Sequence, residues 1–183
     1  MTVKPYQLQP SRTLIVPDVH LDWHWVRAIL EQEEGNWEQL VFLGDYFDSF
    51  LRPPVVASAG QMAEFLLEVE RQYNEKVHFL IGNHDTGYFG LLGSVRVEED
   101  GPFPMDTCSG FSMEATVEIA HVLDPAFPDR CRLFVECNGH LISHAGVHPT
   151  FWRAGQPGVA DPLESLDEDC RSAMECLGKK RLP

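Results

Sequence analysis

The stretch QLVFLGDYFD (residues 39–48) combines an apolar run with a polar ending. The run over 39–43 predicts a buried β-strand. Gly44 allows the backbone to turn sharply where the strand ends, and the carboxylates of Asp45 and Asp48 follow directly. In an open α/β sheet, ligands bind beyond the carboxyl ends of the strands. The segment therefore indicates an α/β protein with a polar site at one edge of its sheet.

Strands and helices alternate on both sides of this segment. Apolar runs predict two further strands, and amphipathic spacing predicts a helix in each interval between them. In chain order these elements are a strand over 13–17, a helix over 23–34, the strand over 39–43, a helix over 55–73 and a strand over 76–81. Such alternation is typical of βαβ units and predicts a largely parallel sheet.

Helical spacing also predicts the faces of the two helices. The first helix carries Trp25, Ile29 and Leu30 on one side. The second helix has one apolar face, formed by Met62, Phe65, Leu66 and Val69. Helices with one apolar stripe pack that stripe against a core.

The second half of the chain has weaker patterns. The stretch 93–110 is rich in glycine, proline and acidic residues, which predicts a loop. Helices are expected over 111–123 and 163–177. Two strands are expected over 131–135 and 140–143, joined by a turn at Asn138-Gly139.

Four polar clusters each follow an apolar run, at residues 18–20 (DVH), 44–48 (GDYFD), 82–85 (GNHD) and 143–146 (SHAG). Their Asp, His and Asn side chains supply oxygen and nitrogen ligands, which suit manganese, iron or zinc. The clusters contain no cysteine, which argues against a closed structural zinc site. Two cations sharing a carboxylate could clamp the attacking and leaving oxygens of a displacement at phosphorus.

In this order the clusters resemble the signature of the calcineurin-like metallophosphoesterase superfamily, which includes the Ser/Thr phosphoprotein phosphatases. The resemblance covers Thr13 to about Pro149. It implies an α/β fold in which a β-sandwich is flanked by helices (α/β/β/α). It also implies hydrolysis of a phosphate mono- or diester by in-line attack of a metal-bound hydroxide. The cofactors would be two divalent metal ions, with manganese preferred over iron or zinc.

The resemblance further implies a role for each matching residue. The metal ligands would be Asp18 and His20 on the first ion, Asp45 bridging both ions, and Asn83 and His144 on the second ion. His84 would protonate the leaving oxygen as a general acid. Asp48 would hold His84 in the required tautomer, as carboxylates often do for catalytic imidazoles.

The sequence departs from the family pattern at several positions. After His144 it has only His148 and no Gly-His segment, so the second metal would lack one ligand. We therefore expect residues 1–183 to be a single domain that is C-terminally incomplete; the alternative is a degenerate or partner-completed site. Ser49 and Ile81 stand where phosphoprotein phosphatases carry arginines, and Leu21 replaces a frequent glycine. The segment 107–111 (TCSGF) is similar to one in a bacterial and phage subgroup.

Each cluster also has a purely structural interpretation. Asp18 and His20 could be polar residues that close a strand, and Asp45 and Asp48 could lie in an ordinary turn. Residues 83–85 could cap a helix, and His144 could be a core histidine. We expect Asp85 to brace its loop and Cys108 to be a plain loop cysteine. The alternative functions are a non-catalytic binding module and a Ser/Thr protein phosphatase-like activity. A nucleotide-binding domain is disfavoured because the chain has no glycine-rich phosphate loop.

Composition limits the partners. The formal net charge of -14 argues against a protein that wraps nucleic acid. The expected substrates are phosphorylated small molecules, nucleotides or phosphoproteins. Five cysteines without a CxxC pair indicate free thiols and a cytoplasmic protein. No signal peptide or membrane-spanning apolar run is apparent, and the sequence leaves the oligomeric state open.

Overall fold

Three parallel strands form the central sheet of the computed structural model, which describes residues 6–8, 11–49, 57–92, 108–156 and 158–179. They are β1 (Thr13–Val16), β2 (Gln39–Phe42) and β3 (Val77–Phe79), with β2 in the middle. Val16 lies opposite Phe42, and Phe42 lies opposite Phe79. The three strands therefore end at one level, and the loops that follow them leave from the same edge. The parallel sheet predicted from the sequence is confirmed.

Helix α2 (Ala59–Tyr73) follows β2 and leads through the short 3-10 helix η1 (Asn74–Lys76) into β3. The four side chains of its predicted apolar face are all buried, as expected. Ser58 caps the helix: its hydroxyl accepts from the Gln61 N–H, and the Gln61 side chain accepts from the Ser58 N–H. This capping box places the helix start at Ala59 rather than at the predicted residue 55. Residues 55 and 56 lie outside the described part of the chain.

Helix α1 (Trp23–Gln32) corrects one predicted face. Trp25 is 42% exposed, whereas Val26 and Leu30 are buried. The buried stripe starts at Trp23, which packs against the core, and continues at positions three and seven residues further on. Trp25 is two positions from Trp23, so it points away from that stripe. Asp22 caps this helix by accepting from the Trp25 N–H at 3.1 Å.

A hairpin of β4 (Phe134–Cys137) and β5 (His140–Ser143) forms a second, antiparallel sheet. Asn138 and Gly139 join the strands with φ values of 54° and 76°, and positive values at both turn residues are those of a type I′ hairpin. The strand predicted over 131–135 begins later than expected. Arg132 instead pairs with the main chain of β3, since its N–H donates to the Phe79 carbonyl and its carbonyl accepts from the Ile81 N–H.

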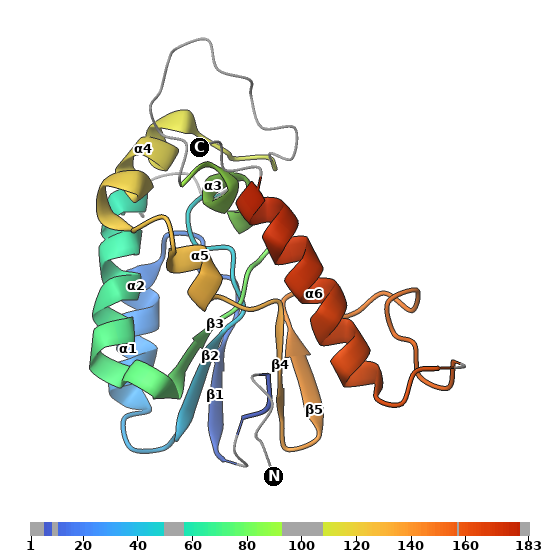
Figure 1. Ribbon diagram of the computed structural model, residues 1–183. Helices are drawn as coiled ribbons and strands as arrows, with labels where there is room; N and C mark the ends of the chain where they lie inside the picture. The colour runs from blue at the N-terminus through green and yellow to red at the C-terminus, as the bar shows by residue number, and fades with distance from the viewer. Residues whose placement is uncertain (1–5, 9–10, 50–56, 93–107, 157, 180–183) are drawn as a thin grey trace.

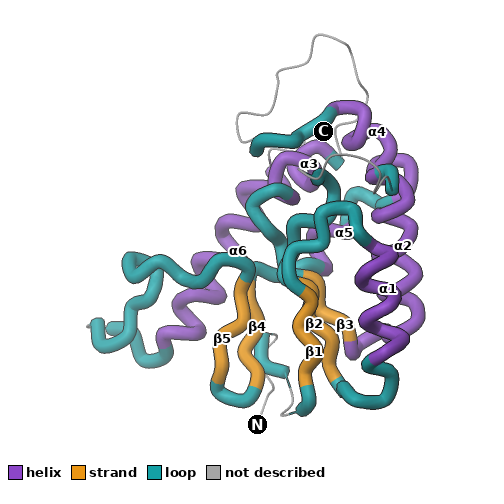
Figure 2. Tube along the Cα trace, turned by 180° about the vertical axis from the view of Figure 1, so that it is seen from behind, coloured by secondary structure: helices purple, strands orange, loops and turns teal. Residues whose placement is uncertain are grey.

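The two sheets pack face to face through Val41, Leu80 and Val135, all buried. Helix α6 (Pro162–Lys179) covers the outer side of the hairpin, where Leu166 meets Phe134. Figures 1 and 2 show the resulting order of layers: α1 and α2, the parallel sheet, the hairpin and α6. The predicted α/β/β/α arrangement is confirmed.

Three further helices complete the described structure: α3 (Asp85–Leu91), α4 (Met113–Val122) and α5 (Phe127–Arg130). The predicted helices over 111–123 and 163–177 correspond to α4 and α6. Most of the predicted loop over 93–110 lies outside the described residues. In the described ranges, no helix has the length and apolar character needed to cross a bilayer.

Stability should depend on pH through His78, a partly buried residue of β3 whose Nε2 lies 2.7 Å from Gln39 Oε1. Burial, aided by the charge of Arg132, lowers the pKa of His78 to about 4. In the unfolded chain this histidine has a pKa near 6.5, so it is protonated over a pH range in which the folded protein keeps it neutral. The free energy of unfolding should therefore fall as the pH drops from about 6.5 to 4. Because the ring is only partly buried, we expect a fall on the order of 1–2 kcal/mol.

The measurement is urea unfolding of the wild type and His78→Gln at several pH values. The variant should lose less stability than the wild type across this window, because it lacks the imidazole that becomes protonated on unfolding. The other titratable groups are the same in both proteins, so their effects cancel in the comparison. Two parallel stability curves would contradict the prediction.

Candidate metal centre

The predicted metal ligands come together beyond the carboxyl edge of the parallel sheet. Asp18, His20 and Asp45 each offer a ligand atom, and these atoms lie within 4.8 Å of one another. On the other side of Asp45, the Nε2 of His144 lies 2.9 Å from Asn83 Oδ1 and 3.5 Å from Asp45 Oδ2. All five side chains therefore surround one small volume, although they come from four separate segments of the chain.

Asp45 lies at the centre of this arrangement and is only 3% exposed. Its Oδ2 lies 3.9 Å from the Nε2 of His20 and 3.5 Å from the Nε2 of His144. Its Oδ1 accepts a hydrogen bond from the His84 N–H at 2.9 Å. One carboxylate oxygen thus stands between two imidazoles, which is the position that a shared ligand of two cations requires.

The hydrogen bonds of the two imidazoles fix their tautomers. The Nδ1 of His20 lies 2.9 Å from the Asp48 carbonyl, and the Nδ1 of His144 lies 3.1 Å from the Leu43 carbonyl. A carbonyl oxygen can only accept, so each Nδ1 carries the hydrogen. In the neutral ring, each Nε2 then turns a lone pair toward Asp45, and that of His144 also lies 2.9 Å from Asn83 Oδ1, a second acceptor, which is an arrangement that suits a cation between these atoms. Histidines that bind metal usually have this arrangement, with the second ring nitrogen donating to a carbonyl or carboxylate.

Asp85 braces the loops that carry these residues, as the sequence suggested. Its buried carboxylate accepts from the backbone N–H groups of Asp45 at 2.7 Å, Tyr46 at 2.8 Å and Gly82 at 2.8 Å. Burial raises the pKa of Asp85 to about 7, against these three hydrogen bonds, which favour the ionised form. The alternative that residues 83–85 cap a helix is wrong, because His84 occupies the N-cap position of α3 without a side-chain capping bond.

Two glycines allow the loops after β2 and β3 to approach each other. A Cβ on Gly44 would lie 2.7 Å from the Gly82 Cα, and one on Gly82 would lie 2.6 Å from the Asp45 nitrogen and would overlap Asp45 Oδ1. Gly44 also has a φ of 116°, in the region that favours glycine. Leu21 has a φ of 67°, which gives a physical reason why glycine suits that position better.

His84 and Asp48 form a buried pair beside the metal-ligand cluster. The Nδ1 of His84 lies 2.9 Å from Asp48 Oδ2, and both residues are less than a tenth exposed. Burial opposes a charge on this imidazole. The hydrogen bond and the charge of Asp48, with further contributions from Asp45 and Asp85, outweigh burial and raise the pKa of His84 above its usual value. The contact is the one predicted for a general acid and its orienting carboxylate.

One neighbour of this pair could not be found from the motifs. The thiol of Cys108 lies 3.7 Å from Asp48 Oδ2 and 3.7 Å from the His84 carbonyl oxygen. The expectation of a plain loop cysteine did not include this contact with the His84–Asp48 pair. Sixty residues separate Cys108 from Asp48, and only the resemblance of the segment 107–111 drew attention to it.

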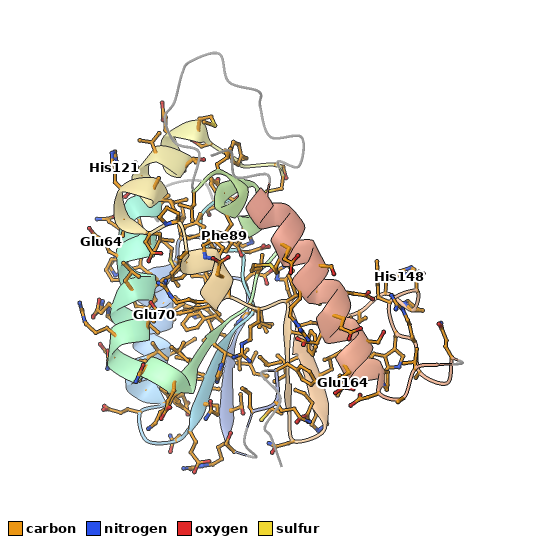
Figure 3. All side chains as sticks on the ribbon, viewed as in Figure 1. Glu64, Glu70, Phe89, His121, His148 and Glu164 are labelled. Carbon is orange, nitrogen blue, oxygen red and sulfur yellow. The ribbon has the colours of Figure 1, made fainter. Side chains whose placement is uncertain are left out.

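His148 does not join the cluster. Its side chain is exposed, and its Nδ1 accepts from the Thr150 N–H at 3.2 Å. Figure 3 shows it in the loop beside α6. Among the described residues, no hydrogen bond or ion pair links His148 to the five predicted ligands.

Comparison with known sequences identifies the family. The sequence profile described as calcineurin-like phosphoesterase matches residues 11–165, which is most of the chain. The chain belongs to this family. Membership supports metal-dependent hydrolysis of phosphoesters in general, and it agrees with the resemblance drawn from the four clusters. No curated protein sequence matches the chain significantly.

The phosphoesterase fold is also seen in solved structures. A cold-active protein-tyrosine phosphatase of the psychrophile Shewanella sp. aligns over 96% of this chain and 52% of its own, with a TM-score of 0.56 and 16% identity. A second structure of a cold-active protein tyrosine phosphatase aligns over 96% of this chain and 51% of its own, with a TM-score of 0.57 and 16% identity. At this identity the likeness extends to the fold alone. The chain spans about half the length of these structures.

Gly82→Ala should disrupt the centre, because the new methyl group would displace Asp45 or separate the two loops. We expect a loss of about 1–3 kcal/mol in the free energy of unfolding, as for other overpacked sites, together with weaker manganese binding by calorimetry. Gly60→Ala is the matched control, since its Cβ would meet its nearest neighbours at an ordinary 3.5 Å. Equal effects of the two substitutions would contradict the steric role of Gly82.

Proposed function

We propose that this phosphoesterase hydrolyses a phosphate mono- or diester with the aid of two divalent cations. Asp18 and His20 would hold the first cation, Asn83 and His144 the second, and Asp45 would bridge both. The observation that supports this most strongly is the orientation of the two imidazoles. Each donates its Nδ1–H to a main-chain carbonyl and turns its Nε2 toward the same carboxylate oxygen.

The charges of the cluster also support bound cations. Four carboxylates gather here, those of Asp18, Asp45, Asp48 and Asp85. In the described ranges, the ion-pair partners of the first three are all histidines. The last three are buried, and like charges held close together in a buried site repel unless something positive lies between them. Divalent cations would remove this repulsion, and Asn83, His20 and His144 complete a ligand set of the kind that manganese, iron and zinc accept.

The remaining residues would handle the proton and fix the geometry. His84, held by Asp48, would donate a proton to the leaving oxygen, and its raised pKa favours the protonated form that this role needs. Asp85 would keep the loops of Asp45 and His84 in register. When bound, the cations would supply Lewis-acid stabilisation of the charge that develops on the phosphate oxygens.

We propose manganese as the cofactor and a phosphorylated small molecule, nucleotide or phosphoprotein as the substrate. Asp18 and Asn83 are exposed, so the cluster opens to solvent and could admit phosphate groups on large or small molecules. Ser49 and Ile81 cannot supply the arginine clamp of the phosphoprotein phosphatases, which makes a protein phosphatase the less favoured alternative. Free thiols at Cys108 and Cys170 are consistent with a cytoplasmic protein.

One observation favours a non-catalytic module as the second candidate. The second cation would be held by Asn83, His144 and the shared Asp45 alone, one ligand fewer than the family pattern provides. Such a site could be too weak to fill. Metal analysis separates the two functions, since about two bound manganese ions per chain indicate the enzyme and zero or one indicates the module.

The activity is tested with protein loaded with manganese and a generic aryl phosphate. We expect turnover that depends on manganese and is abolished by a chelator. Asp45→Asn is the control, because it keeps the size of the side chain and removes the charge that both cations would share. Wild-type turnover no higher than that of Asp45→Asn would refute catalysis by this chain.

The separate roles of two residues give a second test. His84→Ala should lower turnover by about 10²–10⁴-fold, the usual contribution of a general acid, while the bound manganese is retained. Asp45→Ala should remove manganese as well as activity. Both variants are measured for turnover and, by elemental analysis, for metal content. An equal loss of metal in the two variants would show that the roles are assigned wrongly.

A further inference from the structure

Three possible ligand atoms meet at one point beside the proposed metal centre. The Nδ1 of His84 and the Sγ of Cys108 lie 2.9 Å and 3.7 Å from Asp48 Oδ2, and each residue offers a ligand atom within 4.8 Å of the other two. In a tetrahedral zinc site, bonds of about 2.0–2.3 Å place neighbouring ligand atoms roughly 3.3–3.7 Å apart. The observed separations from Asp48 Oδ2 therefore differ by only a few tenths of an ångström from those of a zinc site.

The surrounding structure holds these groups in place. Asp48 is 4% exposed and His84 is 8% exposed. Gly110, with a φ of 97°, brings its main chain so close to Asp48 that an added Cβ would lie 3.4 Å from the Asp48 side chain. The Phe111 N–H donates to the Cys108 carbonyl at 3.2 Å and closes a turn over 108–111. The Tyr88 hydroxyl holds this turn by donating to the Gly110 carbonyl at 3.4 Å and accepting from the Ser112 N–H at 3.3 Å. Cys108 is thus positioned by a packed turn.

Two donors compete for a single acceptor atom in this cluster. Both the imidazole Nδ1 of His84 and the thiol of Cys108 are directed at Oδ2 of Asp48. One divalent cation could replace the two protons without a change in net charge, releasing both to solvent as metal binding to thiols and imidazoles generally does. We propose that Asp48, His84 and Cys108 form a third, separate cation site, selective for a thiophilic ion such as zinc.

The sulfur ligand would distinguish this site from the centre around Asp45. Thiolates favour zinc and cadmium, whereas oxygen-rich sets accept manganese and magnesium. The five residues of the Asp45 centre contribute only oxygen and nitrogen. Manganese should therefore fill the Asp45 centre and leave the Cys108 site to zinc.

Zinc at this site would inhibit hydrolysis, a consequence that rests on the proposed function. The cation would take the Nδ1 of His84, the atom that now bonds to Asp48. With the cation in place of the Nδ1 proton, His84 would keep only its Nε2–H, which is a much weaker acid than the imidazolium that Asp48 stabilises, so the pair could no longer protonate the leaving oxygen effectively. The Cys108 site would thus be an inhibitory zinc site.

A reactive thiol is a weaker explanation for the position of Cys108. Burial, together with the charge and hydrogen bond of Asp48, raises the pKa of the Cys108 thiol to about 11. Nucleophilic and oxidation-prone cysteines have lowered pKa values, because the thiolate is the species that reacts. The surroundings of Cys108 disfavour a free thiolate, and a cation is the partner that would stabilise one.

The test uses cobalt as a spectroscopic substitute for zinc, added to the reduced protein (residues 1–183) already loaded with manganese. A sulfur-to-cobalt charge-transfer band in the near ultraviolet arises only when a thiolate binds the ion. We expect this band to saturate near one equivalent in the wild type and to disappear in Cys108→Ser. The matched control is Cys170→Ser, which removes another partly buried thiol and should keep the band.

Asp45→Asn separates this proposal from the proposed function. The band should survive in that variant, because the Cys108 site does not use Asp45, even if no variant shows any phosphoesterase activity. Asp48→Asn should weaken cobalt binding by at least about 10-fold. The proposal is overturned if the wild type shows no band, if Cys108→Ser keeps it, or if Asp45→Asn abolishes it.

Inhibition is measured separately, with zinc added to manganese-loaded protein and each variant compared with its own zinc-free rate. The zinc concentration for half-inhibition should rise at least about 10-fold in Cys108→Ser. A cobalt band without zinc inhibition would show that the Cys108 site binds a cation but that this cation does not inhibit hydrolysis.

Discussion

The carboxylate of Asp85 accepts N–H groups from two loops at once, and the positions of the proposed ligands Asp45 and Asn83 depend on this contact. Asp45 and Tyr46 follow β2, whereas Gly82 follows β3, so one buried side chain fixes the two loops relative to each other. The Tyr46 hydroxyl reinforces the link by donating to the Leu80 carbonyl at 2.7 Å. With the loops fixed, the Asp45 carboxylate reaches the His84 N–H and stands between two imidazoles. The parallel strands bring these loops to the same edge of the sheet, and the Asp85 carboxylate fixes the loops after β2 and β3 relative to each other.

Much of the fold could be predicted because burial leaves a clear pattern in the sequence. The apolar run over 39–43 and the apolar face of α2 are determined by local periodicity, which depends only on residue type. The errors arose where tertiary contacts decide. Trp25 is as apolar as Trp23, but the angle at which α1 meets the core packs only Trp23 against it. The start of β4 moved because Arg132 pairs with the end of β3, a contact between distant segments that no local pattern encodes.

The candidate site also combines features that the sequence could predict with features that depend on tertiary contacts. The four clusters could be expected to converge because each follows a strand, and parallel strands end at one edge. The tautomers of His20 and His144 could not be expected, because they depend on the carbonyls of Asp48 and Leu43, whose directions are set by backbone turns. The contact of Cys108 with Asp48 could not be expected either, since the resemblance of the segment 107–111 says nothing about which distant residue it reaches.

The wide separation of the ligands along the chain has a thermodynamic consequence. Residues 83 and 144 can share a cation only when the native topology is present, so an unfolded chain would hold such an ion far more weakly. Any cation bound at this edge then shifts the folding equilibrium by mass action, by about 2.7 kcal/mol at a hundredfold excess over its dissociation constant. The loops that carry the chemistry, intrinsically strained at Leu21 and Asp45, would recover through ligand occupancy some of the stability that their backbone conformation costs. In such a protein, metal supply would set the folded fraction of the chain as well as its activity.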